Sequence, residues 1–258
     1  MRRKYFFFDY DGTLAVPRTR EIPQSTQETL ARLRDEGHFI ALATGRLQIN
    51  AVDFISSMGI DNLVADGGNS VTIAGDLKWM EPLDLKPVQE CLRILDTHHI
   101  PWAVTTANEL VRYSPRQDFA EIAGDYYVPT QYDPTLTIDS LSTVYKAYIP
   151  CKLEDEHKVV ETGALKGVPH VRYNSDTIFI EPMDKQRGIK YVMDYFDAPY
   201  EDVVVFGDGF NDVTMFTPEW TSRAMGNARE VLKERATYIT TDCDKDGIKN
   251  ACLHFGWI

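Results

Sequence analysis

The hydrophobic positions of the chain form short apolar runs that alternate with amphipathic stretches. Residues 5–8, 39–43, 63–65 and 203–206 are continuous apolar segments. This pattern is typical of parallel strands that are buried on both faces. Apolar residues at helical spacing lie between the first three runs. The resulting β-α-β-α-β order predicts an α/β fold of the Rossmann-like type, whose strand-end loops gather at one edge of a parallel sheet.

The first of these helices has a recognisable start signal. Ser25 is followed three residues later by Glu28, and Leu30 and Leu33 continue at helical spacing. A serine followed by a glutamate at this distance is the pattern of a capping box. We therefore predict that Ser25 is the N-cap of a helix that ends near Gly37, because glycine commonly terminates helices.

The pattern changes after residue 69. Residues 70–73 and 77–80 read as a hairpin, residues 82–87 as a linker, and the following block as antiparallel strands with two or three helices. The alternation of single buried strands and helices then returns. The sequence thus predicts a catalytic core formed by residues 1–82 and 183–258, into which residues 83–182 insert as a smaller α+β domain.

Composition and charge narrow the possible partners. The chain has 258 residues and a formal net charge of −12. So acidic a surface argues against general binding to nucleic acid or to anionic membranes, which are themselves anionic. Residues 1–4 are basic, but the apolar run after them is too short for a signal peptide. The four cysteines lack metal-type spacing, so we expect reduced thiols in a cytoplasmic protein.

Acidic residues follow the first apolar run directly. Asp9 and Asp11 are two positions apart, so their side chains are expected on the same side of the strand's carboxyl end, where open α/β sheets bind ligands. Gly12 allows a sharp turn after them. Two carboxylates held close together repel each other, and a divalent cation or a shared proton relieves that repulsion.

Three further loops carry side chains suited to phosphoryl transfer, which needs charge neutralisation around the phosphorus. Asp208 and Asp212 follow the fourth apolar run and supply carboxylates for Mg²⁺. Thr44 offers a hydroxyl, Gly45 an unobstructed backbone N–H, and Lys185 a positive charge for phosphate oxygens. In parallel sheets such loops converge although they are distant in the sequence.

In this arrangement Asp9 is the candidate nucleophile, and Asp11, crowded by Asp9, is expected to hold a proton for the leaving group. Arg46 and Asn211 have two readings. Either they contact the substrate, or Asn211 caps a helix and Arg46 pairs with a surface acid.

The four loops together resemble the motifs of the haloacid dehalogenase superfamily. Residues 9–14, Asp-Tyr-Asp-Gly-Thr-Leu, are similar to its first motif, and residues 44–46, Thr-Gly-Arg, to its second. Residues 184–188 resemble the third motif, with Lys185 preferred over Arg187 and Lys190 because of its spacing to Gly188. Residues 207–212, Gly-Asp-Gly-Phe-Asn-Asp, resemble the fourth. The position of the insert is similar to the C2-type cap of the Cof-type phosphatases.

This resemblance implies a mechanism. It implies a covalent aspartyl-phosphate on Asp9, hydrolysed by a water that Asp11 deprotonates. It also implies Mg²⁺ held by Asp9, the backbone carbonyl of Asp11 and Asp208, with Asp212 acting through water or as an orienting acid.

We therefore predict a Mg²⁺-dependent phosphatase, a monomer or homodimer, whose partner is a small phosphorylated metabolite such as a sugar phosphate. Two alternatives stay open. One is a phosphomutase that uses the same nucleophile but returns the phosphoryl group to the sugar. The other is a catalytically silent binding or regulatory protein on the same fold.

Overall fold

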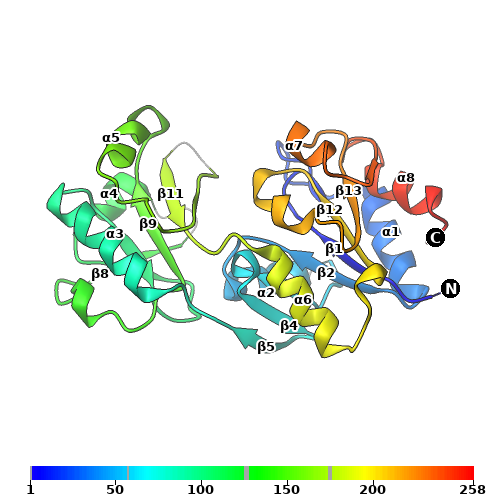
Figure 1. Ribbon diagram of the computed structural model, residues 1–258, viewed down its shortest axis with the longest axis horizontal. Coiled ribbons are helices and arrows are strands. Elements are labelled where there is room, and N and C mark those ends of the chain that lie inside the picture. Colours follow the sequence, from blue (N-terminus) through cyan, green and yellow to red (C-terminus); the bar gives the residue numbers. More distant parts are fainter. Residues whose placement is uncertain (1, 57, 125–127, 174–175) are drawn as a thin grey trace. The chain divides into compact units, whose positions relative to one another are not determined.

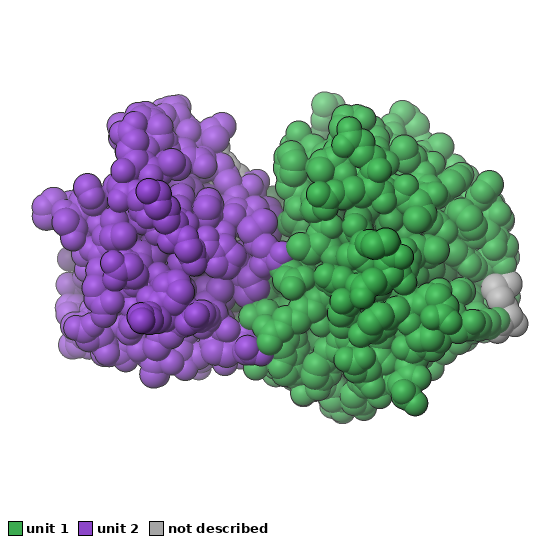
Figure 2. Space-filling model, in the orientation of Figure 1, with its two compact units in different colours: residues 1–80, 184–258 green, residues 81–183 purple. Residues whose placement is uncertain are grey.

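The computed structural model describes residues 2–56, 58–124, 128–173 and 176–258. The chain divides into two compact units (Figure 2). Unit 1 consists of residues 1–80 and 184–258, and unit 2 of residues 81–183. Among the helices of the described ranges, none has both the length and the apolar character needed to cross a bilayer.

Unit 1 is built on a sheet of eight strands in its described part, in the order β14-β13-β12-β1-β2-β3-β4-β5. Neighbouring strands from β14 to β3 pair in parallel, and β4 and β5 extend the sheet as an antiparallel hairpin. The strands are β1 Tyr5–Phe8, β2 Phe39–Ala43, β3 Leu63–Ala65, β4 Ser70–Ile73, β5 Asp76–Met80, β12 Val203–Gly207, β13 Thr221–Ala224 and β14 Tyr238–Ile239.

Strand β1 lies in the middle of this sheet because all of its residues are apolar. Phe6, Phe7 and Phe8 are fully buried. Phe7 is in register with Ala41 of β2 on one side and with Val205 of β12 on the other. A strand buried on both faces needs a continuous apolar run rather than alternation, which is what this segment has.

Helices cover the sheet of unit 1 (Figure 1). Helix α1 packs against α8, and α6 packs against β3 and β4. The helices are α1 Gln24–Asp35, α2 Gln48–Ser56, α6 Lys185–Tyr195, α7 Glu230–Lys233 and α8 Gly247–His254, with 3-10 turns η1 Asp66–Gly68, η4 Tyr200–Asp202 and η5 Phe210–Met215.

The predicted capping box of α1 is wrong. The helix begins at Gln24, with Pro23 in the N-cap position and no side-chain cap. Ser25 therefore lies inside the first turn, where its hydroxyl is buried without a hydrogen-bond partner. Glu28 instead accepts a hydrogen bond from the side chain of Gln24 at 2.8 Å. Proline fixes its own backbone angle near the value that leads into a helix, so the helix starts two residues earlier than the predicted cap implies.

Unit 2 contains a second sheet, with six strands in its described part, in the order β10-β11-β9-β6-β7-β8. Its pairs are antiparallel except β7 with β8, which are parallel. The elements are α3 Leu85–Thr97, β6 Ala103–Thr105, β7 Arg112–Ser114, α4 Phe119–Ala123, β8 Thr130–Tyr132, η2 Ile138–Ser140, β9 Lys146–Pro150, η3 Leu153–Asp155, α5 Glu156–Glu161, β10 His170–Val171 and β11 Thr177–Ile180.

Of residues 82–87, predicted as a linker, only 82–84 lie outside regular structure, and residues 85–87 are helical. Helix α3 starts at Leu85, and the side chain of Asp84 caps it by accepting a hydrogen bond from the backbone N–H of Lys86 at 3.3 Å. Pro87 is accommodated because backbone N–H groups of the first turn have no partner within the helix. The reading of residues 83–182 as a C2-type cap stays a prediction.

Apolar side chains cover both faces of the unit 2 sheet, and charged side chains, among them Arg112, Lys146 and Glu181, are buried with them. Val104, Ile149 and Ile178 belong to a core that includes α3, and their neighbours in the strands pack with α4 on the other face. Lys146 and Glu181 are almost completely buried, and their charged atoms lie 2.5 Å apart. Pairing and hydrogen bonding are what make such buried charges tolerable.

Gly188 sets how closely α6 approaches the sheet. A Cβ atom there would lie 2.4 Å from Cγ1 of Val64 in β3 and 3.1 Å from the carbonyl oxygen of Gly68. We expect Gly188→Ala to lower the free energy of unfolding by up to about 2 kcal/mol, because overpacking costs about 1–3 kcal/mol and the better helix propensity of alanine returns only about 1 kcal/mol. Urea unfolding measures the change.

The double variant Gly188→Ala/Val64→Ala provides the control for this prediction. Val64→Ala removes the clashing methyl group, so the double variant should be more stable than the sum of the two single losses predicts. Strict additivity would contradict the close packing of α6 on β3.

Candidate active site

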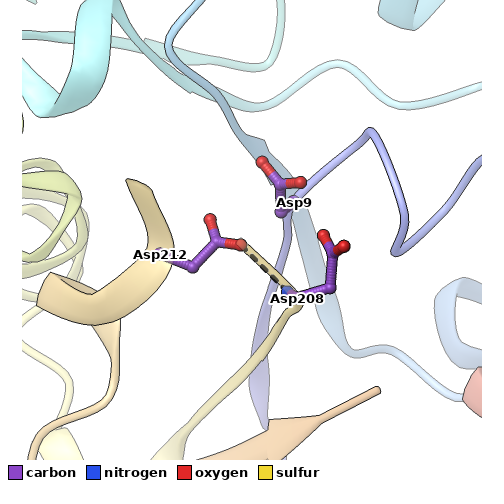
Figure 3. Close-up of side chains that lie close together, drawn as sticks. All are labelled: Asp9, Asp208 and Asp212. Carbon is purple, nitrogen blue, oxygen red and sulfur yellow. Dashed lines mark hydrogen bonds between the residues drawn. The ribbon is translucent and has the colours of Figure 1, made fainter. Parts of the chain in front are cut away.

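The carboxyl ends of neighbouring strands in unit 1 bring acidic residues together. Asp9 follows β1, and Asp208 follows β12, which pairs with β1. The backbone N–H of Asp9 donates to the carbonyl of Phe206 at 3.0 Å, so the pairing continues to the edge of the site. Asp212 comes from the turn η5 just beyond Asp208. Figure 3 shows the three carboxylates facing a common space.

Lys185, the first residue of α6, lies between two of these acids. Its Nζ atom is 2.7 Å from Oδ1 of Asp9 and 2.6 Å from Oδ1 of Asp212. The lysine is 1% exposed, so both ion pairs are buried. The backbone N–H of Lys185 donates to the hydroxyl of Thr214 at 3.1 Å, which ties the start of α6 to η5. Charge and backbone contacts thus hold the lysine at Asp9.

Two other basic residues, Arg187 and Lys190, lie close to Lys185 in the sequence. Lys190 pairs with Glu219 at 2.8 Å, and the guanidinium of Arg187 lies over the ring of Trp79, 4.8 Å from its centroid. Of the three cations, the structure places Lys185 against Asp9.

Both oxygens of the Asp212 carboxylate are engaged. Oδ1 accepts from Lys185, and Oδ2 accepts from the backbone N–H groups of Asp208 and Gly209 at 3.0 and 2.9 Å. Asp212 is fully buried. It therefore fixes the backbone that carries Asp208, a role that suits an orienting acid better than a direct ligand.

The turn at Gly12 depends on the absence of a side chain. Gly12 has a φ angle of +85°, which lies in the region that favours glycine. A Cβ atom at this position would lie 2.1 Å from Oδ2 of Asp208. The carboxylate of Asp208 thus rests directly against the backbone that follows Asp11.

Three acids around one buried lysine create unbalanced negative charge. Burial, followed by the charge of Asp212, raises the pKa of Asp9 above its ordinary value, although Lys185 opposes this. Burial, followed by the charges of Asp9 and Asp212, raises the pKa of Asp208 to about 8. Burial alone would lower the pKa of Lys185, but Asp212 and Asp9 outweigh it and raise that pKa. The lysine is thus firmly charged, and the site still favours more positive charge.

The cluster has the donors that a hard divalent cation prefers. Asp9, Asp208 and Asp212 each offer a carboxylate oxygen, and these atoms lie within 4.8 Å of one another. Carboxylate oxygens are the protein ligands typical of Mg²⁺. A cation would stabilise the charged form of Asp208, whose pKa is raised first by burial and then by repulsion from Asp9 and Asp212. The residues therefore fit a divalent metal ion. The cluster found among the described residues does not include the side chain of Asp11.

Asp11 instead lies toward solvent and meets Arg46. Its side chain is 59% exposed, and its Oδ2 atom is 3.4 Å from Nη2 of Arg46. The Arg46 guanidinium also lies over the ring of Tyr10, 5.5 Å from its centroid. This carboxylate is exposed outside the buried cluster, and Arg46 lies beside it.

The remaining predicted residues sit on the same edge. Thr44 is buried after β2, donates its backbone N–H to Val64 at 2.8 Å, and accepts from the N–H of Arg46 at 3.2 Å through its hydroxyl. Gly45 lies between these two residues. Asn211 is half-buried in η5.

One contact of the site was not predicted. The side chain of Asn227, which follows β13, donates to the carbonyl of Gly12 at 2.8 Å and lies 3.4 Å from Oδ2 of Asp208. It stands outside the four motif-like loops. A glycine and an asparagine shortly after the strand Thr221–Ala224 were the only signal for it in the sequence.

Comparison with known proteins identifies the family. The family model of the haloacid dehalogenase-like hydrolases matches residues 6–252. The chain belongs to this family. The match confirms the predicted resemblance and the class of hydrolase.

Individual relatives cover almost the whole chain. It is 28% identical to the "Putative phosphatase YkrA" of Bacillus subtilis, over 99% of each chain. It is 26% identical to the pyridoxal phosphate phosphatase YbhA of Escherichia coli, over 96% of this chain and 97% of that one. The solved subclass IIB sugar phosphatase BT4131 superposes with a TM-score of 0.78 at 26% identity, over 99% of this chain and 100% of that one. This likeness confirms the predicted α/β fold with its parallel sheet.

The raised pKa of Asp208 predicts a pH dependence of stability in the absence of metal ions. The unfolded chain ionises this group near pH 3.8, whereas the folded chain keeps its proton up to about pH 8. The unfolded state therefore binds fewer protons in this window, and stability falls as the pH rises from about 4 to 8. Asp208→Asn should make the free energy of unfolding fall less steeply with pH, by up to about 1.4 kcal/mol per pH unit.

Urea unfolding of both proteins in EDTA across this pH range measures the effect. The exposed acid Asp35 provides a matched control, and Asp35→Asn should keep the wild-type slope. Parallel profiles for the wild type and Asp208→Asn would contradict the electrostatic account of the cluster.

Proposed function

We propose that the protein is a Mg²⁺-dependent phosphatase that hydrolyses a small phosphomonoester through a phosphoryl group carried on Asp9. The observation that carries this proposal is the buried contact of Asp9 with Lys185 beside the carboxylates of Asp208 and Asp212. It combines a nucleophile, a fixed positive charge and a metal-binding set at one strand end. The names of the relatives, which are phosphatases, support the same class of reaction.

In the first step, a carboxylate oxygen of Asp9 attacks phosphorus while the ester oxygen leaves. Lys185 engages Oδ1 of Asp9, so we assign the attack to Oδ2. Asp11 donates a proton to the leaving oxygen, and the alcohol departs. The exposure of its side chain lets it reach a group outside the buried cluster.

In the second step, water attacks the phosphoryl group on Asp9. Asp11, now ionised, takes a proton from that water, the bond between phosphorus and the Asp9 oxygen breaks, and inorganic phosphate leaves. Both aspartates return to their starting protonation states. One residue thus acts first as acid and then as base, as splitting a reaction into two transfers requires.

Asp9, Asp208 and the backbone carbonyl of Asp11 would hold the Mg²⁺ ion, which when bound neutralises charge on the non-bridging phosphate oxygens. Asp212 positions this set through its hydrogen bonds to the backbone at residues 208 and 209. Lys185 contributes a permanent positive charge at the same place.

The hydroxyl of Thr44, the N–H of Gly45 and Lys185 are the proposed phosphate ligands. Arg46 and Asn211 are the proposed contacts to the substrate. Arg46 is supported by its position beside Asp11, and Asn211 by its place in η5 next to the acidic cluster.

For the substrate we propose a small phosphorylated metabolite, with a sugar phosphate as the first class to test. The structural relative BT4131 is a sugar phosphatase, whereas YbhA is named for pyridoxal phosphate. Unit 2, as the proposed C2-type cap, would select between such leaving groups. A panel of sugar phosphates, pyridoxal phosphate and an aryl phosphate, scored by phosphate release, tests this choice.

The replacement Asp9→Asn tests the mechanism. It keeps the size of the side chain but removes the nucleophilic charge, so turnover of an aryl phosphate should fall by at least about a thousandfold. Phosphate release with Mg²⁺ present measures the loss, and circular dichroism checks that the fold is retained. Asp35→Asn, an exposed replacement of the same kind in α1, should turn over like the wild type.

Metal removal and analysis of the products distinguish a phosphatase from a phosphomutase and from a silent binding protein. EDTA should abolish phosphate release, and added Mg²⁺ should restore it. Retained turnover in Asp9→Asn would contradict the proposed mechanism. A requirement for a bisphosphate activator with little free phosphate released would indicate a phosphomutase, and metal binding without turnover across the panel would indicate a silent binding protein.

A further inference from the structure

Asn227 connects three segments that are distant in the sequence. Its side-chain Nδ2 donates to the carbonyl oxygen of Gly12 at 2.8 Å and lies 3.4 Å from Oδ2 of Asp208. Its Oδ1 accepts from the backbone N–H of Cys243 at 2.8 Å. One amide thus bridges the turn after β1, the acid after β12 and the loop after β14.

The orientation of this amide follows from its partners. Gly12 presents a carbonyl, which can only accept, and Cys243 presents an N–H, which can only donate. A flipped amide would place acceptor against acceptor and donor against donor. The NH₂ group therefore faces the Gly12 turn and the Asp208 carboxylate.

The backbone around Asn227 is built for close approach. A Cβ atom at Gly226 would lie 2.4 Å from Oδ1 and 2.7 Å from the backbone nitrogen of Asp242. The N–H of Gly226 donates to Thr241 at 3.1 Å, and that of Met225 donates to Gly207 at 3.1 Å. The loop is thus tied to its neighbours on both sides, which gives Asn227 a fixed base.

Asp208 needs such support because its neighbours repel it. The carboxylates of Asp9 and Asp212 lie close to it, and its own Oδ2 rests against the backbone of Gly12. The amide of Asn227 contacts both Asp208 and Gly12. It can therefore keep the carboxylate beside the peptide that follows Asp11, without adding charge.

We propose that Asn227 is a positioning residue of the metal site, which orients the Asp208 carboxylate and the Gly12 turn for a divalent cation. This inference rests on the proposed function, in which Asp208 and the carbonyl of Asp11 are metal ligands. Asn227 itself contacts no reacting group in this scheme. Groups that orient metal ligands typically contribute about 10- to 100-fold to metal affinity.

Direct metal binding tests the proposal without turnover. Mg²⁺ affinity is measured by isothermal titration calorimetry on the full chain without substrate, for the wild type and for Asn227→Ala. The dissociation constant should rise about 10- to 100-fold in Asn227→Ala. In kinetics, kcat should recover at high Mg²⁺ concentration, while KM for an aryl phosphate at that concentration stays at the wild-type value.

Asn250, which lies in α8, provides a matched control because its side chain contacts the same loop. Its side chain donates to Oγ1 of Thr241 at 2.9 Å and to the carbonyl of Lys245 at 3.2 Å, so it also ties down the segment that contains Cys243. Asn250→Ala should lower thermal stability as much as Asn227→Ala does, yet bind Mg²⁺ like the wild type.

The outcomes separate this inference from the function on which it rests. Wild-type Mg²⁺ affinity in Asn227→Ala, together with lost affinity in Asp208→Asn, would overturn the role of Asn227 alone. Wild-type affinity in Asp208→Asn would overturn the metal site, and with it both proposals. Equal loss of Mg²⁺ affinity in Asn227→Ala and Asn250→Ala would show that the loss comes from a less stable loop. That result would overturn the inference.

Discussion

The buried ammonium of Lys185 between Asp9 and Asp212 is the interaction on which the site depends. It joins the end of β1, the start of α6 and the turn η5 through bonds of 2.7 and 2.6 Å. Removing one partner of a buried ion pair costs about 3–5 kcal/mol, because the other charge stays buried. Lys185 thus holds Asp9 in place within the fold. Under the proposed function, the same lysine would also supply positive charge to a bound phosphate.

Close backbone approach makes this arrangement possible. Gly12 allows Asp208 to rest on the turn after β1, and Gly188 allows α6 to lie against Val64. Gly68 has a φ angle of +111°, and a Cβ atom there would lie 1.9 Å from the carbonyl oxygen of Asp184, just before Lys185. Larger residues at these positions would move the elements that carry Asp208 and Lys185.

Much of this could be predicted from local sequence. A continuous apolar run such as residues 5–8 indicates a buried parallel strand, and the spacing of Lys185 to Gly188 favoured the lysine that the structure places at Asp9. The start of α1 was mispredicted because Pro23 competes with the capping pattern at Ser25. The role of Asn227 was not predicted because its partner Gly12 is 215 residues away, and no local pattern encodes such a contact.

The proposed mechanism requires that Asp9 carries the phosphoryl group during turnover. Acid quenching of the enzyme during steady-state hydrolysis of a phosphomonoester, followed by peptide mapping by mass spectrometry, tests it directly. We expect one added phosphoryl group on the peptide that contains Asp9, and none on the corresponding peptide of Asp9→Asn. Turnover without any phosphorylated peptide, or with the phosphoryl group on another residue, would contradict the proposed mechanism.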